Sequence, residues 1–213
     1  MGVLMFHRKL GIALGSTVVL MLSVGVSARG QVILYNNGPD GNDGYYQTSF
    51  GAVVTNSFNL SADAILSGGT LTLYAVDDRN TPLRVKWTIT TQPFGGAVMG
   101  EGFVNLESLG NPYPTRFHFF AWRVGFPIPN ISLPAGTYYL QIQDVITRWD
   151  TYIFWAQSSG GSAQGYYNPA PPNGAGGISV VPSESFAILG ERSSGKSAIS
   201  ISPMKSSVSS GRN

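Results

Sequence analysis

The chain contains no cysteine, few charged residues and almost no histidine. The absence of cysteine from all 213 residues excludes disulfides, thiolate metal sites and thiol catalysis. Lys, Arg, Asp and Glu make up 11% of the sequence, against about a quarter in an average globular protein. Uncharged polar residues, glycine and tyrosine must therefore supply most of the surface, which suits a protein of an extracellular wall or matrix.

The first thirty residues have the pattern of a secretory signal peptide. A short basic pair precedes an uncharged, mostly apolar stretch over 10–26, which ends in small residues. Cleavage after Ala28 or after Gly30 places small residues at the two positions that signal peptidase reads. Residues 1–28 are therefore predicted to be a signal peptide, so the mature protein is secreted or lies in the cell envelope. An uncleaved anchor is the alternative, because the stretch just reaches the length of a spanning helix.

The rest of the chain is formally neutral. Removal of the signal peptide leaves 11 of the 13 basic residues against 11 acidic ones. A neutral domain offers no basic face to a phosphate backbone, so nucleic acid is not expected as a partner.

Only one histidine, His118, lies outside the signal peptide. It falls inside the most hydrophobic predicted strand, and a catalytic base there needs an orienting carboxylate and a nucleophile beside it. We expect His118 to be a packed or hydrogen-bonded core histidine rather than a catalytic one.

The arrangement of glycine and proline predicts an all-β domain. These 27 glycines and 13 prolines recur at short intervals between runs of β-branched and aromatic residues. The predicted strands are Val32 to Tyr35, Ala52 to Leu60, Thr70 to Val76, Leu83 to Thr90, Ala97 to Asn105, Arg116 to Phe126, Thr137 to Asp144 and Thr151 to Gln157. Turns are predicted at 68–69, 77–82, 93–96 and 134–136.

Several of these strands have one polar and one apolar face. Thr70 and Thr72 alternate with Leu71 and Leu73, for example, and no window of twelve residues has a convincing helical period. Packing two antiparallel sheets buries such faces, so residues 31–190 are predicted to form one jelly-roll-like β-sandwich.

Two stretches are predicted to lie outside the sheets. Residues 158–177 are rich in glycine, proline and asparagine and predict a long loop. Residues 191–213 hold nine serines in 23 residues and few large apolar side chains. Burial cannot offset the entropy of ordering such a segment, so a disordered tail is expected.

Aromatic residues are the main candidates for a binding surface, because their faces can stack on sugar rings. Trp149 stands between two charged residues at a predicted strand entrance, and four tyrosines lie in glycine-rich loops: Tyr45, Tyr46, Tyr166 and Tyr167. These five residues predict a glycan-binding surface. The alternative is that they fill the core, as the strand positions of Trp87, Trp122 and Trp155 already indicate.

The glycine-rich loop over 36–44 is a second candidate site. It contains five side chains with oxygen atoms, and Asp40, Asn42 and Asp43 are ligand types that Ca²⁺ prefers. The spacing differs from that of an EF-hand loop, and Asn, Asp and Gly are also common turn formers. A turn is favoured, with calcium as the alternative, and no other cofactor is expected.

Carboxylate pairs leave glycoside hydrolysis open as a function, because that reaction needs two carboxyl groups at a suitable separation. Glu101 with Glu107 and Asp144 with Asp150 are the candidate pairs. Nothing in the sequence singles out one pair, so an enzyme is not expected.

Three segments have a familiar pattern. They are SLPAGTYYL over 132–140 followed by WAQS over 155–158, the loop over 36–44 followed by VVTNSFNL over 53–60, and VPSESFAILG over 181–190. The first two resemble domains of exported bacterial proteins that carry the PEP-CTERM sorting signal. The third resembles the start of that signal at Val181, Pro182 and Glu184, but lacks its second proline.

In that family a transmembrane helix and a basic cluster follow the motif, and the complete signal implies processing at the membrane by an exosortase. Here the apolar run ends at Gly190, which is too short to span a bilayer. The resemblance therefore implies an exported bacterial β-sandwich with a degenerate, truncated signal. It implies neither a stable membrane span in the mature chain nor a shared enzymatic activity.

Together these observations predict an exported, non-catalytic structural or adhesive protein of the cell envelope or extracellular matrix. Its expected partner is an extracellular polysaccharide or another envelope component. A carbohydrate-binding module is the alternative function, and a glycoside-active enzyme is the third.

Overall fold

The computed structural model describes residues 31–161, 163–169 and 177–193. The predicted signal peptide and most of the predicted serine-rich tail lie outside these residues. The described residues form fourteen strands: β1 (Val32–Asn36), β2 (Asp40–Gln47), β3 (Val53–Leu60), β4 (Ala64–Ala75), β5 (Pro82–Thr90), β6 (Val98–Asn105), β7 (Glu107–Ser108), β8 (Tyr113–Pro114), β9 (Phe120–Leu133), β10 (Gly136–Thr147), β11 (Ile153–Ser158), β12 (Gly165–Asn168), β13 (Ser179–Val181) and β14 (Phe186–Arg192).

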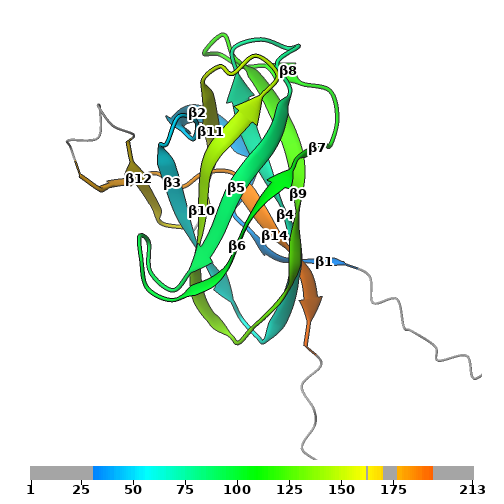
Figure 1. Ribbon diagram of the computed structural model, residues 1–213, viewed down its shortest axis with the longest axis vertical. Coiled ribbons are helices and arrows are strands. Elements are labelled where there is room, and N and C mark those ends of the chain that lie inside the picture. Colours follow the sequence, from blue (N-terminus) through cyan, green and yellow to red (C-terminus); the bar gives the residue numbers. More distant parts are fainter. Residues whose placement is uncertain (1–30, 162, 170–176, 194–213) are drawn as a thin grey trace, which may run out of the picture.

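The strands form two antiparallel sheets that pack face to face (Figure 1). The six-stranded sheet has the order β13-β12-β3-β10-β5-β6. In the eight-stranded sheet, β4 pairs with β9 along one edge and with β14 and β11 along the other. Strand β1 lies outside β14, β2 lies outside β11, and β7 and β8 lie outside β9. The predicted all-β sandwich is confirmed.

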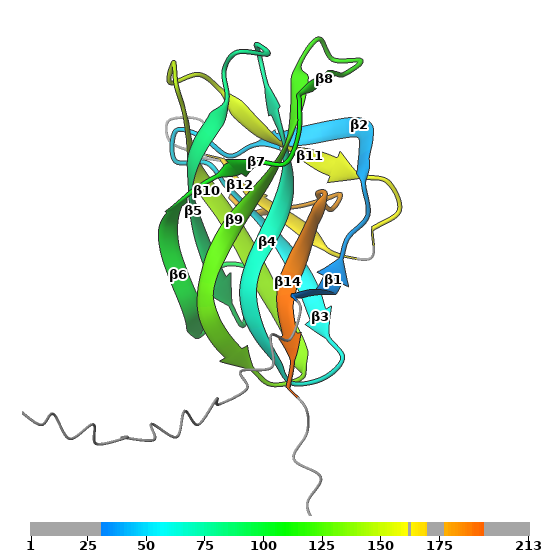
Figure 2. The ribbon, with the colours of Figure 1, turned by 90° about the vertical axis from the view of Figure 1, so that its right-hand side faces the viewer.

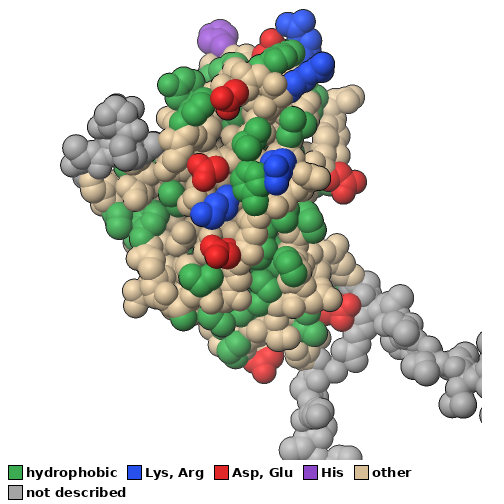
Figure 3. Space-filling view, in the orientation of Figure 1, with side chains coloured by type: hydrophobic (Ala, Val, Ile, Leu, Met, Phe, Trp, Pro, Cys, Tyr) green, Lys and Arg blue, Asp and Glu red, His purple; other side chains and the backbone are tan. Residues whose placement is uncertain are grey.

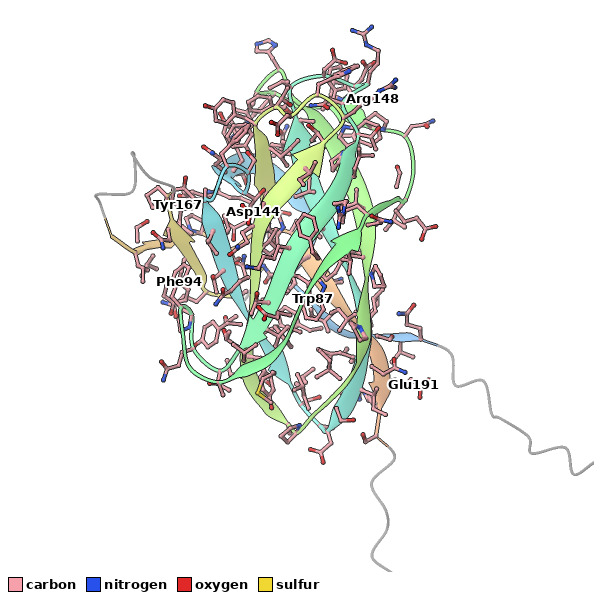
Figure 4. All side chains as sticks on the ribbon, in the orientation of Figure 1. Trp87, Phe94, Asp144, Arg148, Tyr167 and Glu191 are labelled. Atoms are coloured by element: carbon pink, nitrogen blue, oxygen red, sulfur yellow. The ribbon has the colours of Figure 1, made fainter. Side chains whose placement is uncertain are left out.

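One hydrophobic core fills the space between the sheets. Leu71 and Leu73 of β4 enter it from one sheet, and Trp87 and Ile89 of β5 enter it from the other. Trp87 is fully buried and lies between the sheets in Figure 4. The alternation predicted for these strands therefore matches the structure, because the period of two in the sequence reflects burial on one face. Burial is also confirmed for the three tryptophans assigned to the core, Trp87, Trp122 and Trp155.

All eight predicted strands are present, and six further strands were not predicted: β2, β7, β8, β12, β13 and β14. Strand β2 lies in and beyond the predicted turn over 36–44, and β12 lies inside the predicted loop over 158–177. Strand β14 continues to Arg192, two residues past the predicted end of the domain. The first half of β2 consists of Asp, Gly and Asn, which have low β-propensity, but β11 supplies its hydrogen-bonded partners, so tertiary pairing overrides local preference there. Strands β12 and β14 contain tyrosine, phenylalanine and isoleucine, which favour strands, and they pair with β3 and β4.

The predicted turn at Gly68 and Gly69 is wrong, because both residues lie within β4 at a register shift. Glycine is needed there for space. A Cβ added to Gly69 would come within 2.5 Å of the ring of Phe126 on β9. These glycines therefore allow two strands to approach closely and do not reverse the chain.

The predicted core histidine is also wrong. Strand β9 begins at Phe120, and His118 is exposed in the turn before it, with a φ of 62°. The neighbouring Phe117 and Phe119 pack against Tyr45 on the outer face of the eight-stranded sheet, with ring centres 5.1 Å apart in both pairs. The hydrophobicity around His118 therefore reflects a small aromatic cluster over the sheet and not a strand that is buried on both faces.

Charged side chains are sparse on the surface, as the composition indicates. Figure 3 shows them as isolated groups among uncharged polar and apolar atoms. The described part of the chain contains no helix that is long and apolar enough to cross a membrane.

Candidate binding groove

The outer face of the eight-stranded sheet carries a groove with a floor of small side chains. Across the sheet, Gly125 of β9 pairs with Thr70 of β4, and Thr70 pairs with Ala187 of β14. Because none of these side chains is larger than threonine, the surface is low along this row. Figure 2 shows β9, β4, β14 and β1 side by side on this face.

Larger side chains form two walls. Leu109, Tyr113 and Arg123 rise on the side of β7, β8 and β9, and Ile33, Asn36 and Asp40 rise on the side of β1 and β2. The half of the groove near Asp40 has a volume of about 500 Å³, and the half near Gln31 and Glu107 has a volume of about 570 Å³. Thr70 and Leu189 line both halves, so the two halves adjoin over β4.

Asp40 is held in the wall by three hydrogen bonds. Its carboxylate accepts one from the main-chain N–H of Asn42 at 2.7 Å, one from the hydroxyl of Tyr74, and one from the hydroxyl of Tyr113 at 3.2 Å. Burial and then Asp40 itself raise the pKa of Tyr113 to about 12, and burial raises the pKa of Tyr74 above its ordinary value. Both hydroxyls therefore keep their protons and donate to Asp40 at neutral pH.

A row of polar side chains crosses the half of the groove near Asp40. Arg123 pairs across the sheet with Thr72, and the hydroxyl of Thr72 lies 3.3 Å from that of Ser185. Ser185 donates to the carbonyl of Gly38 at 3.0 Å, so Thr72 is the donor in the pair of hydroxyls. The guanidinium of Arg123 forms no ion pair with any described residue.

The aromatic residues predicted from the sequence do not form one surface. Trp149 is 46% exposed, as expected, and lies in the loop between β10 and β11. The guanidinium carbons of Arg79 and Arg148 lie 5.7 and 5.9 Å from the centre of its ring. Figure 4 shows Arg148 at the end of the sandwich, and Trp149 does not line the groove.

The four predicted tyrosines point to three different environments. Tyr45 packs in the aromatic cluster with Phe117 and Phe119. Tyr46 and Tyr167 form a pair with ring centres 5.1 Å apart, and both rest on the main core. Tyr166 contacts Tyr139 on the six-stranded sheet. Of these four, only Tyr46 and Tyr167 are brought together, and both are half-buried.

The residues predicted as calcium ligands have protein partners. Asp40 accepts the three hydrogen bonds described above, and Asn42 accepts one from the main-chain N–H of Arg116 at 3.3 Å. Asp43 forms an ion pair with Arg116 at 3.4 Å. Within the described residues, no three His, Cys, Asp or Glu side chains gather as a metal site. Each of the three side chains thus has a partner within the protein, and all three lie in strand β2 rather than in the predicted turn.

The segment that resembles a sorting signal is part of the sandwich. Val181 ends β13, Pro182 follows it, and Glu184 is fully buried where the chain crosses from one sheet to the other. Strand β14 then runs between β1 and β4. Proteolytic processing at this motif would therefore remove a strand from the interior of a sheet.

The candidate catalytic acids lie on separate elements. Glu101 is exposed on β6. Glu107 on β7 lines the half of the groove near Gln31. Asp144 accepts hydrogen bonds from the Gly51 N–H and the Gln143 side chain, and Asp150 is exposed beside Trp149. Of these four acids, only Glu107 lines the groove.

The sequence prediction missed most of the residues that line the groove, including Tyr113, Arg123 and Ser185. Only the outward alternation of Thr70 and Thr72 indicated the polar face on which the groove lies. Comparison with models of known protein families and with curated proteins finds no match.

Proposed function

We propose that this protein is an exported, non-catalytic adhesive component of the cell envelope or extracellular matrix, which acts by holding a polysaccharide chain in the groove. The observation that carries this proposal is the lining of the groove. Hydroxyl, amide, carboxylate and guanidinium groups surround a floor of Thr70, Gly125 and Ala187. A few placed polar groups on a concave surface are the usual means of orienting a ligand.

The chemistry of these groups fits a sugar polymer. Thr70, Thr72 and Asn36 can donate to and accept from sugar hydroxyls, and Tyr113 offers a ring that is 40% exposed for stacking. The two adjoining halves form a path that crosses several strands, which suits a chain better than a single sugar. Neither predicted carboxylate pair has both members on this path, and Asp40, which lines it together with Glu107, is held by three hydrogen bonds; this supports binding without hydrolysis.

The test is affinity electrophoresis of the exported protein through gels that contain a panel of wall and matrix polysaccharides. Thr70→Trp places a large ring on the floor of the groove and is expected to abolish retardation by the polymer that binds. Thr137→Trp is the matched control, because Thr137 is exposed on β10 in the other sheet. Retardation that survives Thr70→Trp, or no retardation by any polymer, contradicts the proposal and leaves a structural role with protein partners.

A further inference from the structure

Building on the saccharide-binding function proposed above, we propose that the groove selects an acidic polysaccharide and that Arg123 pairs with the carboxylate of a uronic acid unit. The juxtaposition that carries this inference is the guanidinium of Arg123, which has no ion-pair partner among the described residues and lies in the same wall as Tyr113, over a floor of small side chains.

Arg123 is the one described arginine that lines the groove; Arg84, Arg148 and Arg192 also form no ion pair with a described residue, but they lie elsewhere. Arg79 pairs with Asp77 and Asp78, Arg116 pairs with Asp43, and Arg84 lies 4.2 Å from the ring centre of Phe103. Arg123 lines the groove and has no acidic partner among the described residues. Its planar fork of donors matches the two oxygens of a carboxylate.

Asp40 does not take the place of that carboxylate. Three donors already bind it: the Asn42 N–H and the hydroxyls of Tyr74 and Tyr113. Asp40 forms no ion pair with Arg123, and these three bonds fix the position of its carboxylate, whose negative charge remains in this half of the groove. Asp40 instead fixes the Tyr113 hydroxyl, and thereby the position of the ring that lies in the same wall as Arg123.

Glu107 places a second condition on the ligand. It lines the other half of the groove, where its negative charge opposes an acidic unit. A polymer fits both halves best if a uronate lies near Arg123 and a neutral sugar lies near Glu107. The inferred ligand is therefore a heteropolysaccharide in which acidic and neutral units alternate or are interspersed.

The experiment compares uronic acid polymers with their uncharged counterparts. Hyaluronan, gellan and alginate are each used native and after reduction of their carboxyl groups, and binding to the exported protein is measured by isothermal titration calorimetry. We expect at least one native polymer of mixed composition to bind about tenfold more tightly than its reduced form. We also expect this difference to shrink as salt rises, because an exposed ion pair is screened.

Variants assign the effect to one side chain. Arg123→Gln is expected to remove the preference for the native polymer while keeping the affinity for the reduced one, and Arg123→Lys is expected to keep part of it. Arg84→Gln has the same change of charge on the other sheet and is expected to have no effect. A preference that persists in Arg123→Gln or disappears in Arg84→Gln overturns the inference.

Two outcomes separate this inference from the function on which it rests. Equal binding of native and reduced polymers, lost in Thr70→Trp, overturns the acidic preference but leaves the groove as a polysaccharide site. Absence of binding to every acidic and neutral polymer overturns both.

Discussion

The main-chain N–H of Glu184 donates a hydrogen bond to Oδ1 of Asn56 at 3.1 Å and so joins the crossing segment before β14 to strand β3 of the other sheet. The carbonyl of Glu184 accepts a second bond, from the side-chain amide of Asn37 at 2.6 Å. The carboxyl group is fully buried, and neither of its oxygens meets a donor in hydrogen-bonding geometry among the described residues. A titratable group is thus held in the interior by its main chain, and no cationic side chain among the described residues forms an ion pair with it.

This burial predicts that stability falls as pH rises. Burial raises the pKa of Glu184 well above its ordinary value, and the Asn56 side chain opposes this shift only in part. The folded state favours the neutral carboxyl group. The contribution of Glu184 to the free energy of unfolding is therefore fully present below the pKa of the unfolded state and is lost as pH rises through the raised pKa of the folded state. Glutamine does not ionise, so Glu184→Gln removes this pH-dependent loss of stability. We expect the melting temperature of the variant to exceed that of the wild type by an amount that grows from pH 5 to pH 9. Glu101→Gln, at an exposed position, should leave the wild-type profile unchanged, and parallel profiles for wild type and Glu184→Gln would contradict the prediction.

The two hydroxyls that bind Asp40 should differ in their contribution to stability. Tyr74 is fully buried, whereas Tyr113 is 40% exposed and water can replace its bond. We expect Tyr74→Phe to lower the free energy of unfolding by about 1–3 kcal/mol, and Tyr113→Phe by less than about 1 kcal/mol. Urea denaturation of the two variants measures both values. Equal losses would show that the exposed bond matters as much as the buried one.

Strand β14 should be essential to the fold, although its sequence resembles a sorting signal. Ile188 is fully buried between β1 and β4, whereas Val180 on β13 is 67% exposed. Ile188→Ala is expected to cost about 2–5 kcal/mol of stability, and Val180→Ala less than about 0.5 kcal/mol. Chemical denaturation distinguishes the two. An Ile188→Ala protein as stable as the wild type would show that β14 can be detached.

Trp149 provides a test of which surface binds glycan. Its ring lies outside the groove and is flanked by two arginines, so Trp149→Ala is expected to leave retention by polysaccharide gels unchanged. Because the side chain is half exposed, the melting temperature should fall by only a few degrees. A loss of retention with the fold intact would move the binding surface to the loop between β10 and β11.

Calcium is expected to have little effect on the protein. The oxygens of Asp40 and Asn42 accept hydrogen bonds from the chain, and Asp43 pairs with Arg116. Addition of millimolar Ca²⁺ should therefore leave the melting temperature unchanged. A rise that disappears in Asp43→Asn would identify this segment as a calcium site.

Much of the fold was predictable because its signals are local. Alternation along β4 and β5 reports which face is buried, and turn residues at 93–96 and 134–136 mark true chain reversals. The predicted turn at Gly68 and Gly69 was wrong because its outcome depends on a residue far away in the sequence. Gly68 and Gly69 are indistinguishable from a turn in sequence, and only the ring of Phe126 from β9 shows that they provide space.

The amino-acid sequence by itself determined the fold class, the weakly charged surface and the absence of thiol chemistry, since each depends on composition or on a short period. The groove was decided by tertiary structure alone. Arg123, Tyr113 and Asp40 come from three segments that meet only because β8 and β9 pair on one side of β4 while β11, with β2 beside it, pairs on the other. Which side chain stands beside which depends on this pairing, and no local pattern of residues records it.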